Sequence, residues 1–129
     1  MEKRAKILLI DDDVDFVEST KMVLESKPYD VIVAFGGDEG IKKAKEENPD
    51  LVLLDIIMPV KDGFTAAEQF KNDPQLTQIP VLMLTSYSAR RAGSSIPVSR
   101  GYELQADDYL EKPVSPDKLL EIVASYLTK

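Results

Sequence analysis

Short, nearly continuous apolar runs recur along the chain, and most of them end at a polar residue. The first run, Ala5–Ile10 (AKILLI), stops at the acids Asp11, Asp12 and Asp13. A run this short, closed by acids, is typical of a strand that is buried on both faces of a sheet. The same reasoning predicts four more strands, at residues 30–35, 51–54, 80–84 and 107–110.

Between these runs the apolar residues repeat at helical spacing. Residues 14–27 place Val14, Val17 and Leu24 near one face of a helix that Pro28 ends. Three more helices are predicted: one capped by Asp38 that ends near Asn48, one at residues 64–72, and a last one capped by Ser115. Strands and helices that alternate in this way predict an α/β fold, with a doubly wound five-stranded parallel sheet and helices on both faces.

One segment, Ser86–Gln105, departs from this alternation at the place where a fourth helix is expected. It holds the helix breakers Gly93 and Pro97, and three of the chain's four arginines against a single glutamate. We therefore expect the fourth helix region to be atypical. It is either a tolerated surface insertion or a basic patch for an acidic partner.

The length and the uniform composition of the chain predict one domain. A chain of 129 residues fits a single domain, and no linker, repeat or change of composition indicates a second one. We expect residues 1–129 to form that domain, with no output domain. The apolar runs are far shorter than the ~18 residues of a membrane span, and the charged N-terminus does not resemble a signal peptide, so a cytoplasmic protein is expected.

The residue types that are missing exclude several kinds of chemistry. The chain has no Cys and no His, so disulfides, thiolate nucleophiles, zinc–thiolate sites and imidazole catalysis are excluded within it. Carboxylate, hydroxyl and amine groups remain. The net charge of −7 opposes direct binding to nucleic acid or to an anionic membrane, and it suits a cation or a basic protein partner.

Polar residues with complementary chemistry follow four of the predicted strands. Asp11–Asp13 follow the first strand, Asp55 the third, Thr85 the fourth and Lys112 the fifth. Ligands of open parallel sheets bind outside the carboxyl ends of the strands, where these residues would meet. Crowded carboxylates without His or Cys favour Mg²⁺, or Mn²⁺ in its place. A hydroxyl and an amine opposite such a cation suit a phosphoryl group.

Four motifs in this order carry a family resemblance. They are Asp11-Asp12 after the first run, DIIMPVKDG at residues 55–63, Thr85-Ser86, and YLEKP at residues 109–113. Over residues 3–127 the chain resembles the receiver domain of bacterial two-component response regulators. The resemblance implies a flavodoxin-like fold with strand order 2-1-3-4-5. It also implies Mg²⁺-dependent transfer of a phosphoryl group from a phosphohistidine to an aspartate.

The resemblance implies a role for each residue of the reacting centre. Asp55 resembles the phosphoacceptor, and Lys112 would pair with its carboxylate and afterwards with a phosphoryl oxygen. Thr85 would donate its hydroxyl to the phosphoryl group. Asp12 would bind Mg²⁺ directly and Asp11 through a water molecule, with Asp55 as a further ligand.

Further residues have supporting roles in the same resemblance. The backbone carbonyl of Ile57 would complete the protein's share of the metal shell. Pro59 and Gly63 would shape the loop after the acceptor, and Pro113 the turn after the fifth strand. Tyr109 resembles the aromatic switch that moves inward together with Thr85. Asp13 and Asp15 more simply cap the first helix.

The resemblance also implies partners. A histidine kinase or phosphotransfer protein would supply the phosphoryl group, a downstream protein would receive the signal, and a phosphorylation-dependent homodimer stays open. Such a domain is not an enzyme in the usual sense, because it catalyses only its own phosphoryl transfer and dephosphorylation. The alternative is a protein-interaction module on the same fold that works without phosphorylation. A dehalogenase-type phosphatase and a calcium loop are disfavoured, because Asp15 and Phe16 stand where those motifs need Thr or Val and Gly.

Overall fold

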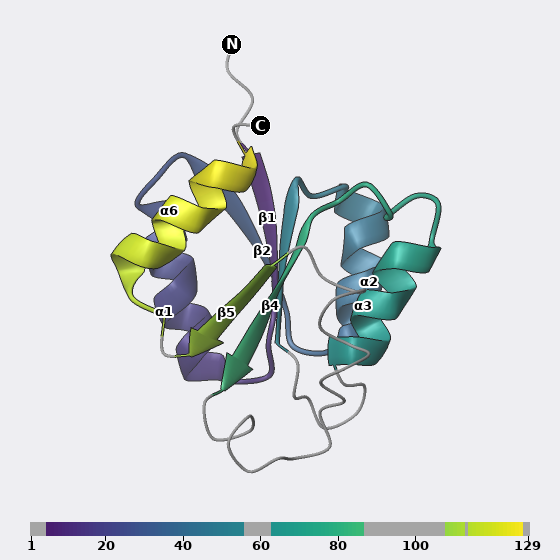
Figure 1. Ribbon diagram of the computed structural model, residues 1–129, viewed down its shortest axis with the longest axis horizontal. Helices are drawn as coiled ribbons and strands as arrows, with labels where there is room; N and C mark the ends of the chain where they lie inside the picture. Colours follow the sequence, from purple (N-terminus) through teal and green to yellow (C-terminus); the bar gives the residue numbers. More distant parts are fainter. Residues whose placement is uncertain (1–4, 56–62, 87–107, 113, 128–129) are drawn as a thin grey trace.

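A parallel sheet lies between two layers of helices in the computed structural model, which describes residues 5–55, 63–86, 108–112 and 114–127 (Figure 1). The strands are β1 (Ala5–Ile10), β2 (Tyr29–Ala34), β3 (Leu51–Asp55), β4 (Val81–Ser86) and β5 (Asp108–Lys112). The helices are α1 (Val14–Glu25), α2 (Gly37–Glu47), α3 (Gly63–Asn72) and α6 (Pro116–Leu127). Residues 87–105 of the atypical segment lie outside the described residues.

The strand order is β2-β1-β3-β4-β5, and every neighbouring pair is parallel. This confirms the predicted fold class and strand order. Helices α1 and α6 cover one face of the sheet, and α2 and α3 cover the other (Figure 1). Within the described part of the chain, no helix has the length and apolar character that a membrane crossing requires.

The strand register brings the carboxyl ends of the strands to one edge. Ile10 of β1 is opposite Leu54 of β3, so the next residues, Asp11 and Asp55, leave adjacent strands at the same level. Asp55 is in turn opposite Leu84 of β4. The predicted site edge is therefore a property of the backbone pairing.

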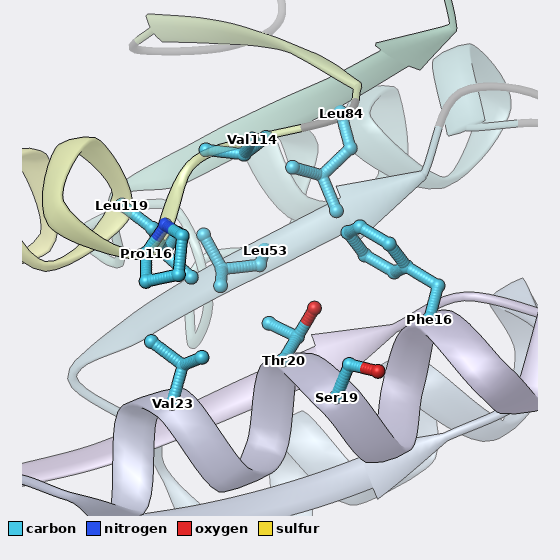
Figure 2. Close-up of a pocket in the computed structure, with 9 residues that line it drawn as sticks. All are labelled: Phe16, Ser19, Thr20, Val23, Leu53, Leu84, Val114, Pro116 and Leu119. Carbon is cyan, nitrogen blue, oxygen red and sulfur yellow. The ribbon is translucent and has the colours of Figure 1, made fainter.

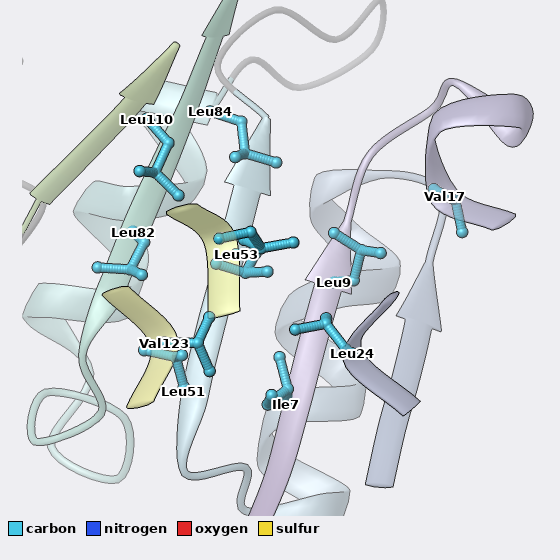
Figure 3. Packing of buried hydrophobic residues seen from close by; sticks show 11 residues of the cluster. Ile7, Leu9, Val17, Leu24, Leu51, Leu53, Leu82, Leu84, Leu110 and Val123 are labelled. Atoms are coloured by element: carbon cyan, nitrogen blue, oxygen red, sulfur yellow. The ribbon is translucent and has the colours of Figure 1, made fainter. Parts of the chain in front are cut away.

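Alternation along each strand divides the core into two apolar layers. Leu8 and Ile10 of β1 pack toward α2 and α3, whereas Ile7 and Leu9 pack toward α1 and α6. Figure 3 shows this second layer, in which strand side chains meet Leu24 of α1 and Val123 of α6. Because both faces are covered, the strands read as continuous apolar runs, as the sequence predicted.

Two of the predicted helix N-caps are confirmed and two are wrong. Asp13 caps α1 by accepting a hydrogen bond from the backbone N–H of Phe16, and Ser115 Oγ accepts one from Lys118 N–H at the start of α6. The predicted cap Asp38 is wrong, because Gly36 occupies the N-cap of α2. Asp15, the second cap predicted for α1, is not its N-cap either. Asp15 and Asp38 lie in the first turns of their helices, where a negative charge interacts favourably with the positive end of the helix dipole.

The predicted inner face of the first helix is correct except at its start. Val17 and Leu24 are buried, but Val14 is 52% exposed. Val14 is the first residue of α1, one turn before Val17, which is the first buried residue of the helix. In α3, Phe70 is buried as predicted.

A glycine in α2 sets the distance between that helix and β1. A Cβ added to Gly40 would overlap Ile10 Cδ1 and lie 2.8 Å from Ile10 Cγ1. Ile10 is fully buried and directly precedes Asp11. Glycine therefore lets α2 pack close to the strand that carries the acids.

We predict that Gly40→Ala lowers the free energy of unfolding by about 1–3 kcal/mol, the usual cost of overpacking a core. The clash outweighs the better helix propensity of alanine, which is worth about 1 kcal/mol. Denaturant unfolding measures the change. Ile10→Val, which removes Cδ1, should restore part of the loss in the double variant. Gly36→Ser is the control, because a Cβ at Gly36 meets nothing within 4 Å. A Gly40→Ala protein as stable as the wild type would contradict the packing argument.

A charged pair fixes the turn between β2 and α2. Glu39 Oε1 accepts a hydrogen bond from Phe35 N–H at 2.9 Å, and Lys43 Nζ lies 3.1 Å from Glu39 Oε2. Lys43 Nζ also donates to the carbonyl of Val33 at 2.6 Å. The Phe35 N–H first and then Lys43 hold the pKa of Glu39 below its ordinary value of 4.5.

We predict a pH-dependent stability difference between the wild type and Glu39→Gln. Because the folded state lowers the pKa of Glu39, its carboxylate stabilises the fold fully above pH 4.5, and this contribution is lost as the pH falls through the folded pKa. The melting temperature of Glu39→Gln should therefore be lower than that of the wild type at neutral pH. The difference in melting temperature should narrow as the pH falls below 4.5 and through the lowered pKa of Glu39. The difference in melting temperature between the wild type and Lys43→Gln should narrow over the same pH range. A difference for Glu39→Gln that persists in acid would contradict a stabilising role of the Glu39 carboxylate.

Candidate functional site

Three carboxylates meet at the carboxyl edge of the sheet. Asp11, Asp12 and Asp55 each offer a carboxylate oxygen, and these oxygens all lie within 4.8 Å of one another. Asp11 is fully buried and Asp55 is 6% exposed, whereas Asp12 is exposed to solvent. Among the described residues, this is the one group of three or more potential metal-binding side chains that the fold assembles.

Strand pairing is the cause of this arrangement. Asp55 is the last residue of β3, and Asp11 and Asp12 directly follow β1, the neighbouring strand. The backbone N–H of Asp11 donates to the carbonyl of Ala34 at 3.1 Å, which prolongs the pairing of β1 with β2 past the end of the strand. The acids are therefore fixed by backbone hydrogen bonds on either side of β1.

The side chain of Asp11 is also held by the chain that follows it. Asp11 Oδ1 accepts a hydrogen bond from the backbone N–H of Asp13 at 3.0 Å. A carboxylate has about four lone-pair positions, so a hydrogen bond from a backbone N–H and a bond to a cation are compatible. Asp13 itself turns away from the cluster and caps α1.

The donor set fits a hard divalent cation. Three carboxylates within 4.8 Å repel one another, and two of them are buried. Bringing negative charges together away from water is costly unless a positive charge compensates them. Oxygen ligands alone select Mg²⁺, Mn²⁺ or Ca²⁺ rather than zinc or copper.

The backbone brings two more predicted residues to the same edge. Thr85 lies in β4, one residue after Leu84, which is opposite Asp55. Lys112 is the last residue of β5 and is opposite Ser86. Tyr109 lies earlier in β5, opposite Met83, and Gly63 begins α3. For these four residues the description covers the backbone and not the side chains. Three further predicted site residues lie outside the described residues: Ile57, Pro59 and Pro113.

An apolar cavity of about 170 Å³, which the sequence did not predict, lies on the face of the sheet that α1 and α6 cover. Figure 2 shows it between α1, α6 and the strands, with the ring of Phe16 and the hydroxyl of Thr20 facing into it. Its walls include Leu53, two residues before Asp55, and Leu84, directly before Thr85. The signal was present in α1, because the lining residues Phe16, Ser19, Thr20 and Val23 repeat at helical spacing.

Sequence comparisons with known proteins identify the family of this chain. The family model "Response regulator receiver domain" matches residues 7–124. The alkaline phosphatase synthesis transcriptional regulatory protein PhoP of Bacillus subtilis is 38% identical over 96% of this chain, which spans 49% of that relative. The chain thus spans about half the length of several curated relatives that it matches. Protein PilH of Pseudomonas aeruginosa is 33% identical, over 95% of this chain and 98% of PilH.

Solved structures agree with the relatives. A putative response regulator from Chloroflexus aurantiacus superposes with a TM-score of 0.84 and 32% identity, over 98% of this chain and all of that chain. The chemotaxis protein CheY4 of Vibrio cholerae superposes with a TM-score of 0.82 and 28% identity, over 97% of this chain and all of that chain. The fold, the acid cluster and these similarities agree, and the chain belongs to the response regulator receiver domain family.

Proposed function

We propose that the protein is a phosphorylation-dependent signalling domain in which Asp55 accepts a phosphoryl group in a Mg²⁺-dependent reaction. The observation that carries the proposal is the meeting of Asp11, Asp12 and Asp55 within 4.8 Å at the edge of a receiver fold. The proposal takes residues 1–129 as one receiver domain. The phosphoryl donor is the phosphohistidine of a histidine kinase or phosphotransfer protein, and a downstream protein reads the phosphorylated state.

Asp55 is the nucleophile of the proposed reaction. A carboxylate oxygen attacks phosphorus, an O–P bond forms, and the N–P bond of the donor phosphohistidine breaks with its electron pair left on the imidazole nitrogen. Asp55 is 6% exposed and is the last residue of β3, a strand in which every residue is buried. A nucleophile fixed in this way reacts with little loss of conformational freedom, because the fold has already ordered it.

The remaining residues bind charge around the acceptor. Asp11, Asp12, Asp55 and the backbone carbonyl of Ile57 would hold the Mg²⁺, which compensates the negative charge that gathers on the phosphoryl oxygens when it is bound. Lys112 at the end of β5 supplies a second positive charge, and the hydroxyl of Thr85 supplies a hydrogen bond. Tyr109 is the aromatic switch that moves inward together with Thr85. Pro59, Gly63 and Pro113 shape the loops beside the site.

We predict that Mg²⁺ reverses the stability order of the wild type and Asp12→Asn. Without a divalent cation, Asp12→Asn should melt at a higher temperature, because it relieves repulsion among the three carboxylates. At a Mg²⁺ concentration about 100 times the Kd, the wild type should gain about 2.7 kcal/mol, or roughly 10 °C in melting temperature. Asp12→Asn should gain far less.

Thermal unfolding with and without a chelator measures this reversal. Glu46→Gln removes the same charge from an exposed position in α2, outside the cluster, and it should respond to Mg²⁺ like the wild type. An equal response of Asp12→Asn and the wild type would contradict the metal site.

We predict that the wild type gains the mass of one phosphoryl group when it is incubated with acetyl phosphate and Mg²⁺. Intact-protein mass spectrometry measures the gain. Asp55→Ala should show none, because it lacks the nucleophile, and a chelator should abolish the gain in the wild type. Absence of any gain, in a protein that still binds its partners, would favour the phosphorylation-independent interaction module.

A further inference from the structure

The first turn of α1 connects the helix cap to the acid cluster. Asp13 is the N-cap residue, with φ −86° and ψ 103°, and its Oδ1 accepts a hydrogen bond from Phe16 N–H at 3.1 Å. Its backbone carbonyl accepts one from Val17 N–H at 2.9 Å. Its own backbone N–H donates to Asp11 Oδ1 at 3.0 Å. One residue thus holds the turn on one side and a buried acid on the other.

Asp13 does not belong to the cluster that it supports. The carboxylates that come within 4.8 Å of one another in the described structure are those of Asp11, Asp12 and Asp55. The Asp13 carboxylate is instead engaged in the cap, and the residue is exposed to solvent. Any effect of Asp13 on a cation must therefore act through the backbone that it fixes or through its charge.

We infer that Asp13 is a positioning residue for the cation site, an inference that rests on the proposed function. The cap holds the first turn of α1, and the turn holds the N–H that orients the carboxylate of Asp11. Mg²⁺ demands near-ideal octahedral geometry, so its affinity depends on how well each ligand is oriented. Removal of a group that hydrogen-bonds directly to a metal ligand typically lowers metal affinity about tenfold to a hundredfold. The Asp13 cap acts on Asp11 only through the turn, so its removal should lower Mg²⁺ affinity less, by about threefold to tenfold.

Charge and orientation can be separated by the choice of substitution. Asp13→Asn and Asp13→Ser remove the charge but keep an oxygen that caps the helix. Asp13→Ala removes both the charge and the cap. Orientation therefore predicts that the alanine variant binds Mg²⁺ more weakly than the two capping variants, which should lie close to the wild type. A purely electrostatic effect would make all three variants equal.

The experiment is calorimetric titration of the full chain with Mg²⁺ alone, after thermal unfolding has shown that each variant is folded at the titration temperature. Ser115→Ala is the matched control, because it removes the Ser115 Oγ cap of α6, which accepts from Lys118 N–H at 3.2 Å. It should lower the melting temperature and leave Mg²⁺ affinity unchanged. Amide hydrogen exchange at Asp13 and Phe16 without Mg²⁺ should be faster in Asp13→Ala than in Asp13→Asn.

Support for the inference is a Kd for Asp13→Ala about threefold to tenfold above those of Asp13→Asn and Asp13→Ser. Equal affinity of the alanine and capping variants would overturn it, as would an equal loss of affinity in Ser115→Ala. A wild type that does not bind Mg²⁺ would overturn both the proposed function and this inference. That result would be seen before any substitution is made, so the two failures are distinguishable.

Discussion

The pairing of β1 with β3 is the constraint on which the rest of the molecule depends. Its register sets Ile10 opposite Leu54 and so brings Asp11, Asp12 and Asp55 together one residue further on. A slip by one residue would turn each strand side chain toward the other helix layer, where it would no longer fit the close-packed core. The two apolar layers therefore enforce the register, and the register enforces the proximity of the acids.

This proximity opposes stability, because the carboxylates repel one another. The repulsion is confined to the three carboxylates, whereas the apolar burial that offsets it extends over the whole sheet. The last four residues of β1 and all of β3 are buried, and both helix layers add side chains to the core. Burial of each large apolar side chain contributes about 1.5–3 kcal/mol, so a few of them offset the cost of a preformed acidic site. The site can be held in place before any ligand arrives.

The elements that the sequence predicted well are those with a strong local signal. Strands buried on both faces appear as apolar runs, and Asp13 and Ser115 precede their helices at the ordinary cap position. The cap of α2 was predicted wrongly because Asp38 offers the typical side chain, whereas the chain already turns at Gly36. The cavity on the α1 and α6 face was missed because the repeat in α1 marks one wall, whereas the other walls come from α6 and two strands that only the fold brings to it.

The origin of the acids in the chain has a consequence for biosynthesis. Asp11 and Asp12 directly follow β1 and Asp55 ends β3, while Thr85 and Lys112 belong to the later strands β4 and β5. Chains emerge from the ribosome N-terminus first, so every carboxylate of the cluster is available before the groups that would bind the phosphoryl oxygens. The nascent protein thus holds the residues for a cation earlier than it can be competent for signalling.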